Sequence, residues 1–211
     1  MDYLKKSAEI LAGTGFEDDI PFMYRDKKGW VTVGVGQMIR DVNAAQRYPF
    51  ETPLGAKATA AQIESDYRRV HAIPAGLYAH RYRSDSSLLL SEEYIQALLL
   101  TRLKEFDIAL RRHYRRYDTF PEPVKLALLD MIYNLGGPKL FGSFTEFEKA
   151  VNAQDWKSAA DRCHRIHKGS NDDRNAWTRH QFLISEVRKP VPELPVHPAH
   201  YDAPVMLPPK G

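Results

Sequence analysis

FEDDIPFMYRDKKGWVTVGVG, at residues 16–36, is the most informative stretch of this chain. From Trp30 onward, valines alternate with Thr32 and the glycines, and this period of two is typical of a β-strand. Asp26-Lys27-Lys28-Gly29 precedes the alternation and has turn chemistry, with Asp first and Gly last. We therefore expect strands over residues 20–36 that are joined by a tight turn.

Helical periodicity dominates the chain outside this stretch. Residues 2–12 carry apolar side chains at helical spacing. Thr59-Ala60-Ala61-Gln62 fits a capping box at the start of a helix that runs to about Ala72. This helix is polar, as expected of a helix that links two lobes. Further helices are expected from Ser91 and over residues 124–135, 144–151, 155–164 and 172–187.

This order of elements predicts an α+β fold, with a small sheet followed by a helical body. We expect one domain over residues 1–188, with a sheet lobe at about 14–57 and a helical lobe at about 58–188. Residues 189–211 contain seven prolines and no helical period. This tail is expected to be solvated, and a docking peptide is the alternative.

Charge and composition exclude little. The formal net charge of +3 favours an acidic polymer, either cell wall or nucleic acid, without deciding between them. Runs of arginine such as 111–116 invite a nucleic-acid reading, but a solvated helix face or steering toward anionic wall polymer is simpler. We therefore expect no nucleic-acid partner.

The cysteine and histidines point to no cofactor. A single cysteine, Cys163, excludes an internal disulfide, and its helical context indicates a buried core residue. The eight histidines have no metal-ligand spacing, so we expect neither a metal nor a cofactor. No segment approaches the ~20 apolar residues of a membrane span, and the first residues are too polar for a signal peptide. We expect synthesis in the cytoplasm and no stable membrane insertion.

Three residues in the opening stretch form a candidate catalytic set. Glu17 and Asp26 are nine positions apart, and Thr32 follows six positions later. Hydrolysis of a glycosidic bond needs two carboxyl groups in unlike settings, one to give a proton and one to activate water. Each residue also has an ordinary interpretation, as an acidic loop, a turn former and a strand residue. Their combination with the glycine frame favours catalysis.

The pattern Y-x-D-x-x-G-x-x-T-x-G-x-G at Tyr24–Gly36, with Glu17 upstream, resembles that of the phage-type (T4-like) lysozymes. The segments 124–136, 147–160 and 171–177 are similar to helices of that family. The chain departs from the typical member at Gln37, which replaces a histidine, and in the acidic residues that follow Glu17.

The resemblance implies a lysozyme-like fold and an N-acetylmuramidase that cleaves the β-1,4 bond between N-acetylmuramic acid and N-acetylglucosamine in peptidoglycan. Glu17 would be the general acid, Asp26 would orient water, and Thr32 would hold that water. The family inverts the anomeric centre, which requires carboxyl groups ~6.5–9.5 Å apart. Lysis of the bacterial wall is the expected outcome.

Four further residues are candidates for substrate binding. Gln37 follows the glycine frame, and Asn134 matches a family position that faces the cleft, with a helix-ending role as its alternative. Arg174 matches an arginine that pairs with the catalytic glutamate, and its alternative is a surface arginine. Trp30 is expected either to stack on sugar or, more simply, to pack in the core.

Two other functions stay open. A lytic transglycosylase needs the acid but no water-activating Asp, and a wall-binding module needs neither. The expected partners are glycan strands of peptidoglycan, and an immunity protein or a delivery machinery is possible. Release through a holin or injection by a secretion system would bring the protein to its place of action, the cell wall in the periplasm.

Overall fold

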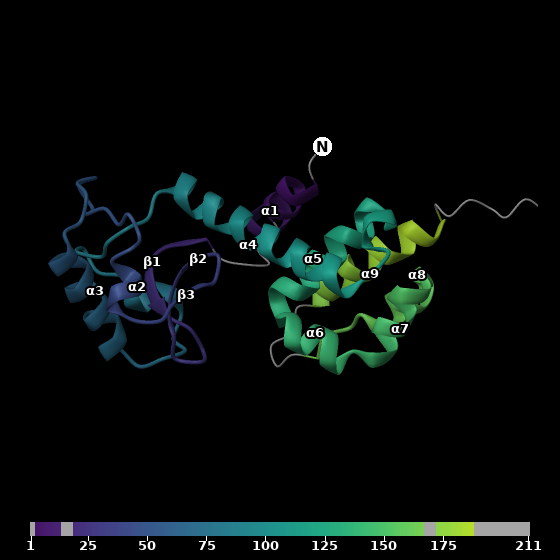
Figure 1. Cartoon of the computed structure of the whole chain (residues 1–211). Coiled ribbons are helices and arrows are strands. Elements are labelled where there is room, and N and C mark those ends of the chain that lie inside the picture. The colour runs from purple at the N-terminus through teal and green to yellow at the C-terminus, as the bar shows by residue number, and fades with distance from the viewer. Residues whose placement is uncertain (1–2, 14–18, 167–171, 188–211) are drawn as a thin grey trace, which may run out of the picture.

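The computed structural model describes residues 3–13, 19–166 and 172–187. It is an α+β structure in which a small sheet and a body of helices lie at opposite ends of one long helix (Figure 1). In chain order the elements are α1 (Tyr3–Gly13), β1 (Ile20–Arg25), β2 (Val31–Gly34), β3 (Gln37–Ile39), α2 (Val42–Ala45), α3 (Ala60–Ala72), η1 (Ala79–Tyr82), α4 (Glu92–His113), η2 (Tyr117–Thr119), α5 (Glu122–Leu135), α6 (Gly137–Ser143), α7 (Thr145–Ala153), α8 (Trp156–Arg162) and α9 (Asp172–Val187).

The sheet is antiparallel in the order β1-β2-β3. Tyr24 pairs with Thr32 across β1 and β2, and Val31 pairs with Ile39 across β2 and β3. Val31, Val33 and Ile39 are buried in the core, and α3 packs against β1 and β2. The strands expected over residues 20–36 are confirmed. The short β3 was not predicted, because three residues are too few to show a period.

The linking helix was assigned wrongly. The polar helix begins at the predicted capping box. There the Thr59 side chain accepts from the backbone N–H of Gln62, and the Gln62 side-chain oxygen accepts from the backbone N–H of Thr59. This helix, α3, packs against α2, β1 and β2, so residues 60–72 belong with the sheet and not with the helical lobe. Its polarity reflects an exposed outer face of a small lobe rather than a bridge.

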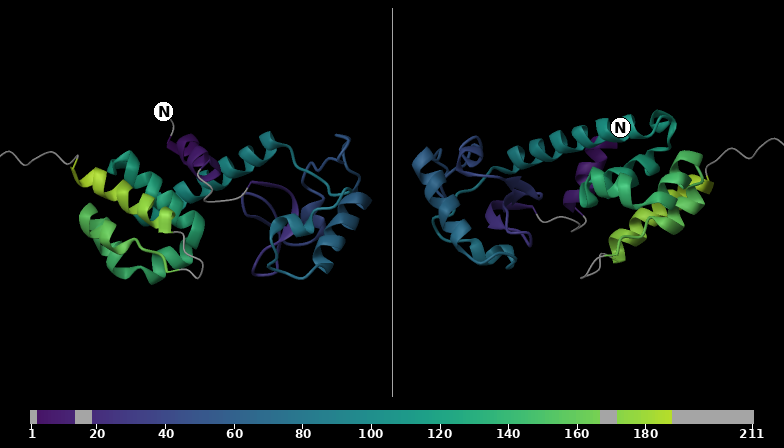
Figure 2. Two further views of the ribbon diagram at one scale, coloured as in Figure 1. Left: turned by 180° about the vertical axis from the view of Figure 1, so that it is seen from behind. Right: turned by 60° about the horizontal axis from the view of Figure 1, so that its bottom comes forward.

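The helix that joins the lobes is α4. Its 22 residues span about 33 Å. Near its start, Ile95 lies against Gly34 of the sheet, and farther along α4 packs against α1 and α5 (Figure 2). Leu103 and Leu110 of α4 are fully buried in the helical body. The long helix predicted from Ser91 is confirmed, and the Ser91 side chain caps it by accepting from the N–H of Tyr94.

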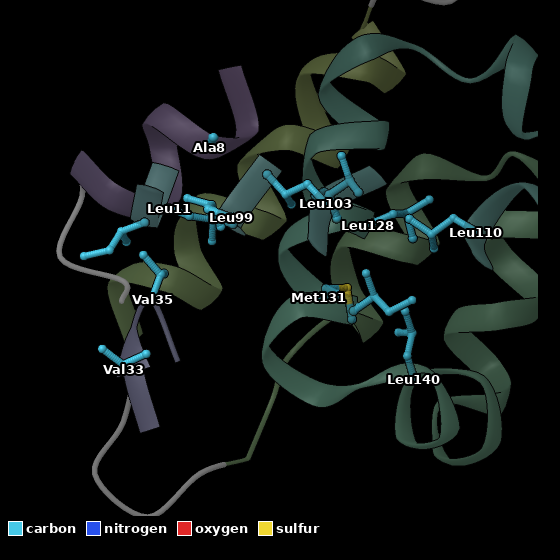
Figure 3. Packing of buried hydrophobic residues seen from close by; sticks show 14 of the residues in the cluster. Ala8, Leu11, Val33, Val35, Leu99, Leu103, Leu110, Leu128, Met131 and Leu140 are labelled. Carbon is cyan, nitrogen blue, oxygen red and sulfur yellow. The ribbon is translucent and has the colours of Figure 1, made fainter. Parts of the chain in front are cut away.

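The centre of the helical body is α5. Leu128 and Met131 are fully buried and lie beside the α4 leucines and Leu140 (Figure 3). α1, α4 and α9 pack around α5. Gly136, with a φ of 77°, ends α5 as predicted. The chain then continues at once into α6, which was not predicted because two glycines and a proline look like a stop.

Two other expectations concern single features. Cys163 is buried, which confirms its interpretation as a core residue. Among the described helices, none combines the length and the apolar character needed to cross a membrane. The proline-rich tail at 189–211 lies outside the described residues.

Candidate functional site

Glu17 lies outside the described residues, so its position is not part of the structure. In the sequence it falls between α1, which packs on α4 and α5, and β1, which belongs to the sheet. Its distance to Asp26 is therefore a prediction.

Asp26 occupies the first position of the turn between β1 and β2. Its Oδ1 accepts hydrogen bonds from the backbone N–H groups of Lys28 and Trp30, both at 2.9 Å. Its own backbone N–H donates to the Trp30 carbonyl oxygen at 2.9 Å. Gly29 completes the turn with a φ of 90°. Asp26 therefore has the turn-forming role that its sequence context predicted, and the same bonds fix the orientation of its carboxylate.

The register of the hairpin sets the place of Thr32 relative to the turn at Asp26. Thr32 pairs with Tyr24, so these two side chains lie on the same side of the sheet, and Asp26 follows one residue after the end of β1. Thr32 is only 3% exposed, and its Oγ1 donates to the Trp30 carbonyl oxygen at 3.2 Å. Because that bond uses the hydroxyl hydrogen, the oxygen retains lone pairs that can accept from a further donor.

Trp30 lies beside Asp26 on the turn. It is 46% exposed, so the expectation that it packs in the core is wrong. Asn134 is exposed in the last turn of α5, where the expected cleft-facing and helix-ending roles are both compatible with its place.

Gln37 lines a small cavity where the sheet meets α4 and α5. The cavity has a volume of about 10 Å³, which is room for about one water molecule. At its edge, the Tyr133 hydroxyl of α5 donates to the Val35 carbonyl oxygen and so ties the helical body to the sheet. The residues that line it are Gly34, Val35, Gln37, Ile95, Leu98, Leu99, Arg102 and Tyr133.

Arg174 is buried in a polar cluster, and its expected alternative as a surface arginine is wrong. It lies in the first turn of α9, is 1% exposed, and donates from Nε to Asp130 Oδ1 at 2.6 Å. Arg165 Nη1 donates to the other Asp130 oxygen at 2.8 Å. Thr178 Oγ1 donates to that same oxygen at 2.8 Å and accepts from Arg165 Nη2 at 2.6 Å. Its burial suits a positioning role for Arg174 rather than direct contact with a sugar.

Of this cluster, the sequence identified only Arg174, and it did not identify Asp130, Arg165 or Thr178. Asp130 is the one acidic residue inside the apolar run at 124–135, and Arg165 follows α8. A carboxylate on the buried face of an apolar helix is a signal for a buried partner. Nothing in the sequence identifies that partner, because Arg165 and Arg174 are 35 and 44 positions away.

Asp19 is the described residue nearest in sequence to Glu17. Its pKa is raised above the ordinary value, first by partial burial and then by the negative charge of Glu92 in the first turn of α4. At Asp19 itself, the neutral form of the carboxyl group is therefore favoured.

Over residues 3–13, 19–166 and 172–187, no group of three or more His, Cys, Asp or Glu side chains is arranged to hold a metal ion. The comparisons with known proteins give no family: no model of a protein family matches the chain, and no curated protein matches it.

Proposed function

We propose that this protein is a peptidoglycan hydrolase, an N-acetylmuramidase with an inverting mechanism and a lysozyme-like fold. The observation that supports the proposal is the hairpin itself, in which Thr32 pairs with Tyr24 two positions before Asp26 and two backbone N–H groups bond to the Asp26 carboxylate. Glu17, nine positions before Asp26 in the sequence, would supply the second carboxyl group that the chemistry needs.

Asp26 and Thr32 suit the binding of one water molecule. Among the described residues, none donates a hydrogen bond to Asp26 Oδ2, so this oxygen is available to take a proton from water. Thr32 Oγ1 gives its own hydrogen to Trp30 and so acts as an acceptor toward the same water. A water that donates to both residues directs its lone pair away from them, toward the anomeric carbon of a bound sugar.

Glu17 would give its proton to the leaving oxygen. A general acid must be protonated before it acts, so this role requires that the pKa of Glu17 be raised, for which nearby negative charge such as that of Asp18 and Asp19 would serve. Arg174 acts in the opposite sense, since a guanidinium group beside a carboxylate favours its ionised form. We assign Arg174 to orienting Glu17, on the basis of the resemblance and of its burial next to Asp130.

A water-binding pair favours hydrolysis over the transglycosylase alternative, which has no use for water at the anomeric carbon. The substrate would be the glycan strand, which lies outside the cytoplasm. We therefore also propose delivery by a holin or by a secretion system, and an immunity protein would accompany the second route.

The test is clearing of purified peptidoglycan by the wild-type chain and by two isosteric variants. Glu17→Gln removes the proton and keeps the shape, so we expect activity to fall about 10²–10⁴-fold, and Asp26→Asn should also impair it severely. Matched controls are Glu9→Gln and Asp172→Asn, which change exposed carboxylates on α1 and α9. Full activity of Glu17→Gln, or an inactive wild-type chain, would refute the proposal.

A further inference from the structure

The segment after α3 packs on the tip of the catalytic hairpin. A β-carbon at Gly76 would lie 3.7 Å from the Cα atom of Lys27, and β-carbons at Gly29 and Ala75 would be 3.9 Å apart. Arg25 Nη1 donates to the carbonyl oxygen of Ile73 at 2.9 Å. The hairpin tip and this segment lie side by side at the lower edge of the sheet lobe (Figure 1).

This segment is held in place by its own buried residue. Tyr82 is fully buried, and its hydroxyl donates to the Pro74 carbonyl oxygen at 2.6 Å and accepts from the Leu77 N–H at 3.3 Å. Arg69 of α3 donates to the Tyr82 carbonyl oxygen at 2.8 Å and to Ser87 Oγ at 3.0 Å. The residues between 74 and 82 are therefore a braced loop.

The braced loop presents apolar surface to solvent. Tyr78 is 82% exposed and its ring stacks on His80, with ring centroids 5.9 Å apart and planes at 10°. Leu77 is 43% exposed, and Trp30 on the adjoining turn is 46% exposed. These side chains lie on two segments that pack against each other, and contiguous exposed apolar surface marks a binding site.

The charged residues around these rings are mainly basic, with Asp26 beside Trp30 as the acidic neighbour on the hairpin. Lys27 and Lys28 on the hairpin tip and Arg81 in η1 are exposed. Asp85 is the only acidic residue between positions 71 and 86. The surface therefore suits a ligand that offers apolar ring faces and carries negative charge.

We propose that Tyr78, His80 and Trp30 form an accessory subsite for the glycan strand, beyond the sugar held at Asp26. The inference rests on the proposed function. Pyranose rings have apolar faces that stack on aromatic side chains, and each muramic acid of a peptide-free strand carries a lactyl carboxylate that complements Lys27 and Arg81. The subsite therefore takes an N-acetylated, anionic glycan.

Binding of peptide-free glycan strands to the full chain tests this subsite. The Glu17→Gln chain serves as parent, so that the strands stay intact during titration. Tyr78→Ala should weaken binding about tenfold, which corresponds to 1.4 kcal/mol. Tyr78→Phe, which keeps the ring, should bind within about twofold of the parent. Leu54→Ala is the matched control, because Leu54 is 95% exposed in the same lobe.

Each outcome decides the proposal. Tyr78→Ala affinity equal to that of the parent would overturn the subsite, even if the wild-type chain cleaves peptidoglycan. If Tyr78→Ala loses glycan affinity and Tyr78→Phe keeps it, but the wild-type chain cleaves no peptidoglycan, the subsite would be supported and the proposed hydrolase activity refuted. A parent chain that does not bind the strands, or that binds a single-stranded oligonucleotide more tightly, would also overturn the subsite.

Discussion

Gly34→Ala tests how closely α4 approaches the sheet. Gly34 ends β2 with a φ of 57°, a conformation that costs an L-residue about 1–2 kcal/mol. The added methyl group would lie 3.0 Å from Ile95 Cγ2. Ile95 is 2% exposed and the cavity beside it has room for only about one water molecule, so the methyl group overpacks this contact at a cost of about 1–3 kcal/mol. The sum is a loss of about 2–5 kcal/mol in the free energy of unfolding.

Gly36→Ala is the matched control, because it has the conformational cost of a positive φ but no overpacking against a neighbouring side chain. Gly36 has a φ of 72°, and nothing lies within 4 Å of a β-carbon there. We expect this variant to lose only the conformational cost, about 1–2 kcal/mol. Urea unfolding of both variants and the wild type, followed by circular dichroism, gives the two free energies. Losses that agree within about 0.5 kcal/mol would refute the tight contact between Gly34 and Ile95.

Three other predictions follow from the buried and half-buried polar groups. Asp130→Asn should cost about 3–5 kcal/mol in urea unfolding, because Arg165 and Arg174 stay buried without their carboxylate, and a loss under about 1 kcal/mol would contradict the cluster. Burial raises the pKa of the Cys163 thiol to about 11, so a thiol reagent should label the native chain slowly at neutral pH, and immediate stoichiometric labelling would show the thiol to be accessible. The pKa of Tyr3 is raised from 10.0 to about 12, first by burial and then by a hydrogen-bonded carboxylate, so the folded state favours the neutral phenol. The resulting contribution to the free energy of unfolding is present below pH 10 and is lost as the pH rises toward 12. Because the ring is partly exposed, we expect this contribution to be only about 1 kcal/mol. It is measured as the difference in unfolding free energy between the wild type and Tyr3→Phe across this pH range.

The sequence predicted the elements whose signals are local. Thr59 and Gln62 form the expected capping box, and Gly136 ends α5 as expected. Each of these features depends on residues a few positions apart, or on a backbone conformation that only one residue type adopts easily.

The features that the sequence did not predict depend on distant partners. A polar helix such as α3 is expected both between two lobes and on the outside of a small sheet. The helical spacing of apolar residues therefore did not show that α4, rather than α3, joins the lobes. Asp130 of α5 accepts hydrogen bonds from Arg165 and from Arg174 of α9, which are 35 and 44 positions away in the sequence. Trp30 was expected in the core because large aromatic residues are usually buried, but its place on the hairpin tip exposes it.

Digestion in heavy-oxygen water shows whether a water molecule attacks the cleaved glycosidic bond. Purified peptidoglycan is digested with the wild-type chain in water enriched in heavy oxygen, and the released fragments are identified by mass spectrometry. We predict muramic acid reducing ends that carry one heavy oxygen atom, because water held by Asp26 and Thr32 attacks the anomeric carbon. Unlabelled 1,6-anhydro ends would contradict it, since they form without any attack by water.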